Sequence, residues 1–257
     1  MAHDASTDRF SSFDGIELSY LDSGRGVPVV LLHGFASDSY RNWVGPGVFD
    51  AIRATGRRVV ALDARGHGAS DKPHDEAAYS HRAMVRDVQA LLDHLGAEVA
   101  DVCGYSMGAI TTVQLPPLEP RVRSVVLGGI GAGLLDGAVA RRAPEIAAAL
   151  SADDPAAVSG SVARAFRAFA VATGADRAAL AALQRSRADE EPWRVERLGI
   201  PGVVIAGRGD ELVGDPAALA EHIGADAVLV PGNHLTAVLA PEFAEAIVSF
   251  LEATRGA

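Results

Sequence analysis

Several residue types and sequence features are scarce or absent in this chain. Its 257 residues include one cysteine, Cys103, and one lysine, Lys72. A single cysteine excludes an internal disulfide and a cysteine-based metal cluster, and it suits a reducing compartment. No apolar stretch reaches the roughly 20 residues of a membrane span. The first twenty residues also lack the apolar run of a secretory signal, so we expect a cytoplasmic protein without a membrane partner.

Positive charge is in deficit as well. The chain carries 23 lysine and arginine residues against 33 aspartate and glutamate residues, a formal net charge of −10. Nucleic-acid binding depends on clustered Lys and Arg, so we expect no nucleic-acid partner. Arginine pairs do occur at Arg57 and Arg58 and at Arg141 and Arg142, and such pairs are typical of solvated helix ends.

What the chain does contain is the pattern of a globular α/β protein, with 49% hydrophobic and 22% charged residues. Short β-branched runs predict strands that are buried on both faces of a parallel sheet. These runs cover 29–32, 59–62, 99–103, 122–127, 203–206 and 228–230. Segments with helical periodicity lie between them, as in Met84, Val88 and Leu91. Alternating strands and helices predict a doubly wound sheet.

Two segments depart from this alternation. Near the N-terminus, Asp14-Gly15 separates apolar stretches at 9–13 and 16–21, which predicts a hairpin and an antiparallel edge. Between residues 131 and 193 the β-branched runs disappear, and alanine and arginine dominate. We therefore expect an eight-stranded, mostly parallel core formed by 1–130 and 194–257, with 131–193 as a small helical cap inserted after the sixth strand.

A G-x-S-x-G motif follows the strand predicted at 99–103. Ser106 stands at its centre, in Gly104-Tyr105-Ser106-Met107-Gly108, with a helical segment after it. A serine on such a tight turn has a strained backbone, and flanking glycines avoid the clashes that Cβ atoms would make. The motif therefore presents Ser106 as a candidate nucleophile.

A serine nucleophile needs a base, and the base needs a third group to fix its tautomer. Asp210 follows the strand predicted at 203–206, and His234 follows the strand predicted at 228–230. Both fall at carboxyl ends of strands, where open α/β sheets keep their ligand sites. Among the rivals, His222 falls within a predicted helix, Asp215 is a predicted helix N-cap before Pro216, and Asp226 precedes its strand.

The strand predicted at 29–32 ends in His33-Gly34-Phe35, and with this feature the sequence resembles the α/β-hydrolase superfamily over nearly its whole length. The resemblance implies an oxyanion hole formed by the backbone N–H groups of Phe35 and Met107. It also implies that the loop 63–71 is structural and that His67 is a scaffold residue. The family usually continues the helix after the nucleophile for about three turns, but Pro116 and Pro117 predict that this helix ends or distorts near Leu115.

The fold hosts several reactions, and some are disfavoured here. Epoxide hydrolases and haloalkane dehalogenases of this superfamily use an aspartate where Ser106 stands. The epoxide enzymes also need cap tyrosines, which 131–193 lacks, and hydroxynitrile lyases rely on a lysine near the site. Ester hydrolysis, carbon-carbon bond hydrolysis of meta-cleavage products, lactone hydrolysis and perhydrolase activity stay open, as does a non-catalytic ligand receptor.

Ester hydrolysis is the least demanding of these reactions, so the sequence predicts a serine esterase that acts on a small ester or related acyl substrate through an acyl-enzyme, without cofactor or metal. The oligomeric state stays open. The small cap favours a compact substrate. Candidate pocket residues are the turn residues and nearby aromatics His33, Gly34, Trp43, Phe166, Phe169 and Trp193.

Overall fold

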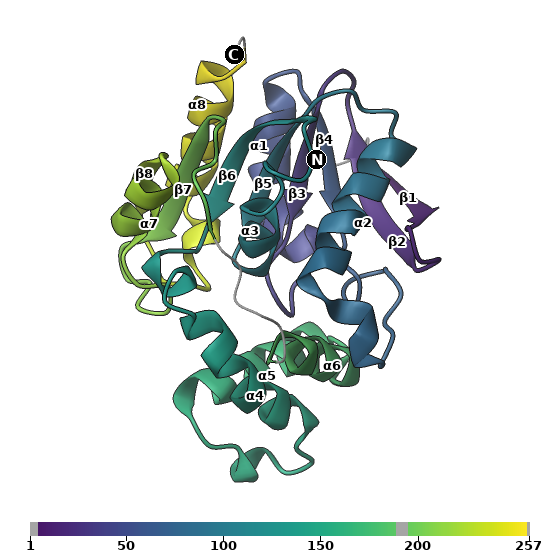
Figure 1. Cartoon of the computed structure of the whole chain (residues 1–257), viewed down its shortest axis with the longest axis vertical. Helices are drawn as coiled ribbons and strands as arrows, with labels where there is room; N and C mark the ends of the chain where they lie inside the picture. The colour runs from purple at the N-terminus through teal and green to yellow at the C-terminus, as the bar shows by residue number, and fades with distance from the viewer. Residues whose placement is uncertain (1–4, 189–194, 256–257) are drawn as a thin grey trace.

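One sheet of eight strands organises the computed structural model, within the described residues 5–188 and 195–255 (Figure 1). The strand order is β1-β2-β4-β3-β5-β6-β7-β8. Strand β2 is antiparallel to β1 and β4, and the remaining neighbours are parallel. The predicted mostly parallel sheet with an antiparallel edge is confirmed. The strands are β1 (Ser6–Ser11), β2 (Glu17–Ser23), β3 (Pro28–Leu32), β4 (Arg58–Leu62), β5 (Ala100–Tyr105), β6 (Val122–Gly128), β7 (Gly202–Gly207) and β8 (Asp226–Val230).

The N-terminal hairpin has a longer tip than the sequence predicts. Phe13 and Ile16, which we placed in strands, lie in the turn between β1 and β2. The Ser12 N–H donates to the Ile16 carbonyl oxygen at 2.8 Å, and Gly15 has a φ of 84°. The Phe13 ring lies 3.5 Å from the guanidinium carbon of Arg86, so its side chain packs on a neighbouring helix.

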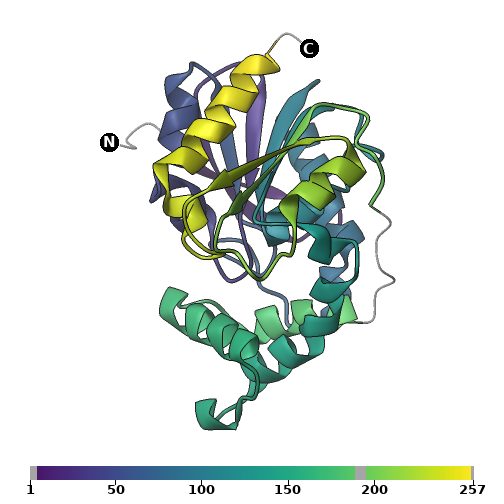
Figure 2. The ribbon, with the colours of Figure 1, turned by 90° about the vertical axis from the view of Figure 1, so that its left-hand side faces the viewer.

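Helices cover both faces of the sheet (Figure 2). Helices α1 (Val48–Ala54) and α8 (Pro241–Ala253) share a core with Val29 and Leu31 of β3. The alternate residues Val30 and Leu32 belong to the core on the opposite face. Helices α2 (His81–His94), α3 (Met107–Thr112) and α7 (Pro216–Ile223) contribute to that second core. Burial on both faces explains the uninterrupted apolar runs in the sequence.

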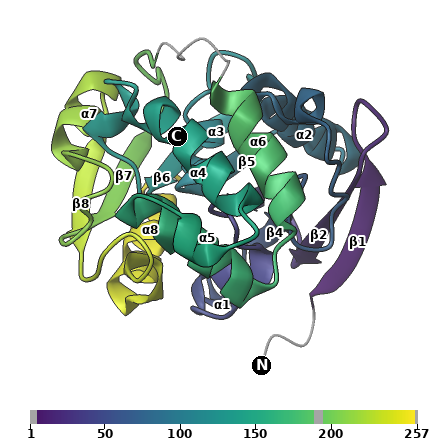
Figure 3. The same cartoon turned by 90° about the horizontal axis from the view of Figure 1, so that it is seen from below.

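Three helices fill the predicted cap between β6 and β7. They are α4 (Ala138–Ser151), α5 (Ser161–Thr173) and α6 (Arg177–Ala188), and they lie together beyond one end of the sheet (Figures 1 and 3). Ile146 and Leu183 of these helices share a small core with Phe35 and Met107 of the body. The cap is therefore packed directly against the turns that carry the candidate site. The predicted cap boundary at Trp193 lies outside the described residues.

The helix after the candidate nucleophile is short, as Pro116 and Pro117 predict. Helix α3 ends at Thr112. A hydrogen bond between residues three apart follows, in which the Leu115 N–H donates to the Thr112 carbonyl oxygen at 3.1 Å. The chain then turns before β6. The disruption lies at the far end of α3 and leaves its first turn regular.

The two arginine pairs differ in how they compare with the prediction. Arg57 and Arg58 flank the start of β4, and Arg57 is buried with its Nη1 2.6 Å from a carboxylate oxygen of Asp101. The expectation of a solvated helix end is wrong for this pair, because the fold brings Arg57 within hydrogen-bond distance of Asp101, a buried acid of β5. Arg141 fits the expectation, since its side chain is 65% exposed.

Two further properties concern the whole described part of the chain. None of its helices combines the length and the apolar character needed to cross a membrane. Within the same residues, no group of three or more His, Cys, Asp or Glu side chains is placed to hold a metal ion. Cys103 is buried in β5 with a free thiol.

Candidate active site

Ser106 occupies a sharp turn between β5 and α3. Its φ of 50° is in the left-handed region, which non-glycine residues rarely adopt, and the Ser106 N–H donates to the Gly128 carbonyl oxygen at 2.8 Å. A Cβ on Gly104 would lie 2.3 Å from the Gly108 carbonyl oxygen, and one on Gly108 would lie 2.0 Å from the Leu32 carbonyl oxygen. Both glycines are therefore sterically required. A strained residue held this firmly is typical of functional sites.

The other two predicted residues converge on Ser106. His234 Nε2 lies 3.0 Å from Ser106 Oγ, and His234 Nδ1 lies 2.9 Å from Asp210 Oδ2. The Asp210 side chain has no exposed surface, and its Oδ1 accepts a hydrogen bond from the Leu212 N–H at 3.2 Å. A buried carboxylate held in this way can keep the proton on His234 Nδ1 and leave Nε2 free to accept one from Ser106.

Tyr105 supports the histidine from the residue before Ser106. Its hydroxyl donates to the His234 carbonyl oxygen at 2.8 Å, and burial raises the pKa of the phenol. The phenol therefore stays protonated and acts as a donor. This bond joins the serine turn to the histidine loop.

Two of the three alternative residues lie where the sequence predicts, whereas Asp226, which we placed before its strand, lies within it. His222 lies in α7, with its Nε2 2.8 Å from the Val195 carbonyl oxygen, and Asp215 caps α7 by accepting from the Ala217 N–H at 2.9 Å. Asp226 is the first residue of β8.

The turn at 33–35 lies against the serine. A Cβ built on Gly34 would be 3.6 Å from the Cβ of Ser106, and the Gly34 N–H donates to Asn42 Oδ1 at 2.9 Å. Phe35 and Met107 both line a cavity with Ser106. Among the described residues, no backbone acceptor is bonded to the N–H of either one. Two such amides beside a nucleophile suit the stabilisation of an oxyanion.

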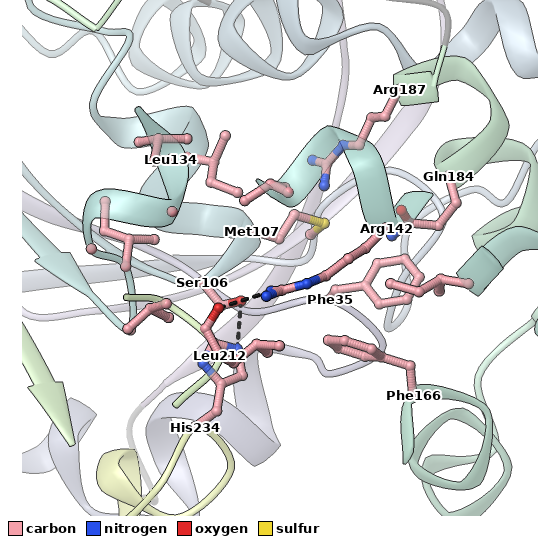
Figure 4. Close-up of a pocket in the computed structure, with 18 residues that line it drawn as sticks. Phe35, Ser106, Met107, Leu134, Arg142, Phe166, Gln184, Arg187, Leu212 and His234 are labelled. Carbon is pink, nitrogen blue, oxygen red and sulfur yellow. Dashed lines mark hydrogen bonds between the residues drawn. The ribbon is translucent and has the colours of Figure 1, made fainter. Parts of the chain in front are cut away.

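A cavity of about 80 Å³, here called the Arg142 cavity, opens beside Ser106 and His234 (Figure 4). Most of its wall is apolar, and three polar side chains from the cap also contribute. The apolar side chains include Ile110, Ile130, Leu134, Val139, Ile146 and Phe166, and the polar ones are Arg142, Gln184 and Arg187. Ligand sites commonly combine apolar walls with a few polar groups in this way.

A second cavity, of about 190 Å³, meets the first at the same residues. We call it the Leu239 cavity, and it shares Phe35, Ser106, Phe166 and His234 with the Arg142 cavity. Two cavities that join at one serine can receive the two halves of a substrate whose central bond is cleaved.

The candidate pocket residues divide into three groups. Phe166 lines both cavities, and Gly34 and Phe169 line the Leu239 cavity. Trp43 does not belong to the pocket, because it is 0% exposed in the core beneath α1 and α8. The expectation that His33 lines the pocket is wrong as well.

The His33 ring is buried in the scaffold, where Nδ1 lies 2.8 Å from the Gly34 carbonyl oxygen and Nε2 accepts from the Ala64 N–H at 3.0 Å. Trp193 lies outside the described residues.

His67 behaves as the scaffold residue that the family resemblance implies. It is buried, its Nδ1 lies 3.0 Å from the Arg65 carbonyl oxygen, and its ring centroid is 5.0 Å from that of His33. Burial lowers the pKa of the His67 imidazole well below its ordinary value, and the nearby His33 lowers it further.

The sequence prediction missed the polar wall of the Arg142 cavity. Val139, Arg142 and Ile146 follow the three- and four-residue spacing of one helix face, and so do Gln184 and Arg187. That spacing was a usable signal. The spacing indicates that these residues share one helix face, but it does not indicate what that face packs against.

Comparison with known proteins identifies the fold family. A family model described as the alpha/beta hydrolase fold matches residues 27–173. The chain is 44% identical over 104 residues to epoxide hydrolase B of Mycobacterium tuberculosis, which covers 40% of this chain and 28% of that protein. It is 35% identical over 116 residues to 2-hydroxymuconate semialdehyde hydrolase of Pseudomonas putida, which covers 45% of this chain and 40% of that protein.

The curated matches are therefore partial, since the chain spans less than half the length of these relatives. A crystal structure of a hydrolase from Pseudomonas aeruginosa PA01 covers all of both chains, with 28% sequence identity and a TM-score of 0.74. The predicted fold class is confirmed, and this chain belongs to the alpha/beta hydrolase fold family.

Proposed function

We propose that this protein is a serine hydrolase that cleaves small carboxylic esters through an acyl-enzyme. The observation that carries the proposal is the continuous series of contacts from Asp210 through His234 to Ser106, with distances of 2.9 and 3.0 Å. Each member comes from the loop after a different strand, so their meeting depends on the alignment of β5, β7 and β8 in the sheet. The same three residue types in these roles recur in acyl transfer on unrelated folds.

Each group then has one role in the reaction. Ser106 Oγ attacks the carbonyl carbon while its proton passes to His234 Nε2, and the Phe35 and Met107 amides bind the resulting oxyanion. The carbon-oxygen bond to the alcohol breaks, and the alcohol leaves with the proton from His234. Water then attacks the acyl group and gives its proton to His234, which returns it to Ser106 as the acid is released.

A serine at the nucleophile position favours this chemistry over that of the epoxide hydrolase relative. Epoxide opening in this superfamily uses an aspartate there, whereas Ser106 suits attack on a carbonyl group. Carbon-carbon bond cleavage, lactone hydrolysis and perhydrolysis would use the same triad. The two cavities that meet at Ser106 support cleavage of a substrate with groups on both sides of its carbonyl.

Hydrolysis of p-nitrophenyl acetate and butyrate tests the proposal. The wild type should release nitrophenol with an initial burst, and Ser106→Ala should lower kcat by about 10⁴-fold or more. Ser249→Ala, on the exposed face of α8, is the matched control and should keep full activity. Equal rates for wild type and Ser106→Ala would refute the proposal and favour a ligand receptor.

A further inference from the structure

Arginine 142 points from the cap into the Arg142 cavity, while its neighbour in sequence points to solvent. Val139, Arg142 and Ile146 line the cavity from one face of α4. The Arg141 side chain is 65% exposed and lies 3.5 Å from a carboxylate oxygen of Asp136. Of these two neighbouring arginines, only Arg142 therefore lies in the cavity.

The guanidinium of Arg142 is fixed close to the candidate triad. Its Nη1 donates to the Leu212 carbonyl oxygen at 2.8 Å, and the Leu212 N–H donates to Asp210 Oδ1 at 3.2 Å. Figure 4 shows the side chain extended across the cavity toward Ser106. A guanidinium carries five N–H donors, and one hydrogen bond uses only one of them.

The charge of the cavity wall is opposite to that of the whole chain. The formal net charge of the chain is −10, yet Arg142 lines this cavity and none of the described lining residues is an aspartate or glutamate. Gln184 adds a further polar group. A guanidinium among apolar walls is best compensated by an anion that it can bind in a bidentate manner, and a carboxylate has the matching shape.

The acyl half of the substrate is the half that reaches this cavity. His234 must protonate the leaving oxygen, so the leaving group lies along the His234 loop, where Leu235 and Leu239 line the Leu239 cavity. The Arg142 cavity extends away from that loop, past Met107 and Ile110. Its volume of about 80 Å³ is well below the roughly 300–1,000 Å³ of drug-sized ligand pockets, so the acyl group is compact.

We infer that the physiological substrate carries a carboxylate on a short acyl group and that Arg142 binds this carboxylate while Ser106 attacks the carbonyl. The inference rests on the proposed serine hydrolase function and narrows its substrate class. Arg142 thereby becomes the residue that determines specificity.

Two methyl esters of equal size test the inference. Monomethyl glutarate has a carboxylate where methyl 5-methylhexanoate has an isopropyl group, and a pH-stat follows the hydrolysis of both. The wild type should prefer the anionic ester, and Arg142→Met should lower the ratio of the two kcat/KM values by about 10- to 100-fold because a charge-assisted hydrogen bond is lost. Arg142→Lys should keep part of the preference, since it retains the charge without the planar fork. The matched control Arg141→Met should keep all of it.

Binding gives a second readout that does not require turnover of either ester. Glutarate should slow the labelling of Ser106 by an alkyl fluorophosphonate at concentrations at which 5-methylhexanoate does not, and Arg142→Met should abolish the difference. Equal protection by the two acids, or an unchanged ester preference in Arg142→Met, would overturn the carboxylate inference. Ser106-dependent hydrolysis of the neutral ester would in that case leave the proposed function standing, whereas a wild type that neither labels nor hydrolyses would overturn both.

Discussion

Replacement of Asp210 by asparagine tests the candidate triad by exchanging one carboxylate oxygen for an NH₂ group. The buried carboxylate accepts from two donors, His234 Nδ1 at 2.9 Å and the Leu212 N–H at 3.2 Å. Asparagine keeps the shape but offers one acceptor and one donor group. The asparagine side chain can therefore accept a hydrogen bond from only one of the two groups, His234 Nδ1 or the Leu212 N–H.

The two orientations of the amide set the size of the effect. If the amide oxygen stays on Leu212, the NH₂ group faces His234 Nδ1 and forces the proton onto Nε2, where it blocks proton transfer from Ser106. Such a tautomer lowers kcat by about 10⁴. If the amide flips, its NH₂ group opposes the Leu212 N–H, and an unsatisfied buried donor costs about 1–3 kcal/mol, or about 5- to 150-fold. The flipped form also lacks the charge that stabilises the imidazolium, so we expect a loss of kcat of about 10²- to 10⁴-fold.

Hydrolysis of p-nitrophenyl butyrate measures the loss, and thermal unfolding shows whether the variant is folded. Asp215→Asn is the matched control, because asparagine caps a helix as well as aspartate does. An Asp210→Asn enzyme that is folded and keeps more than a tenth of the wild-type kcat would refute the assigned role of Asp210.

Three further predictions concern the scaffold. Gly108→Ala places a Cβ 2.0 Å from the Leu32 carbonyl oxygen, so we expect a loss of about 1–3 kcal/mol and a lower thermal midpoint; an unchanged midpoint would contradict the packing of α3. Asp101→Ala removes the nearer of the two carboxylates beside the buried Arg57 and leaves Glu252 at 3.6 Å, so it should cost about 3–5 kcal/mol in urea unfolding, whereas a loss below about 1 kcal/mol would show that Glu252 compensates the charge of Arg57. His67 stays neutral in the folded state because burial lowers its pKa, while the unfolded chain takes up the proton below about pH 6.5. The free energy of unfolding should therefore fall below pH 6.5 by up to about 1.4 kcal/mol per pH unit, and His67→Gln should flatten this dependence in urea titrations at several pH values; identical slopes would contradict it.

The sheet and the candidate triad could be predicted because their signals lie within short stretches of sequence. Each run of β-branched residues is buried on both faces, so its apolar pattern is unbroken and its end is marked by glycine and polar residues. Ser106, Asp210 and His234 stand at such ends, and parallel strands bring those ends to one edge. Their placement therefore follows from strand order with little dependence on side-chain packing.

The pocket depends on how the cap docks, and that information is not local. Phe166 and Trp43 are both aromatic candidates for the pocket, yet Phe166 lines the cavities and Trp43 lies in the core. Arg142 and Arg141 are neighbours with opposite surroundings. In each case the outcome depends on what the segment packs against in the folded chain, and composition and periodicity do not identify that partner.

The hairpin tip shows the same limit on a smaller scale. The Asp14-Gly15 signal placed the turn correctly, but its length depends on contacts from α2. Phe13 lies outside the strand, with its ring against the guanidinium of Arg86. A turn motif fixes where the chain reverses, and tertiary contacts determine how many residues the reversal takes.

Mass spectrometry of the covalent intermediate tests the central claim most directly. After brief exposure to p-nitrophenyl butyrate and an acid quench, the wild type should carry one butyryl group on the peptide that contains Ser106. His234→Ala should prevent its formation, and His222→Ala, in the exposed part of α7, should not. A butyryl group on another residue, or none in a wild type that turns the ester over, would contradict nucleophilic catalysis by Ser106.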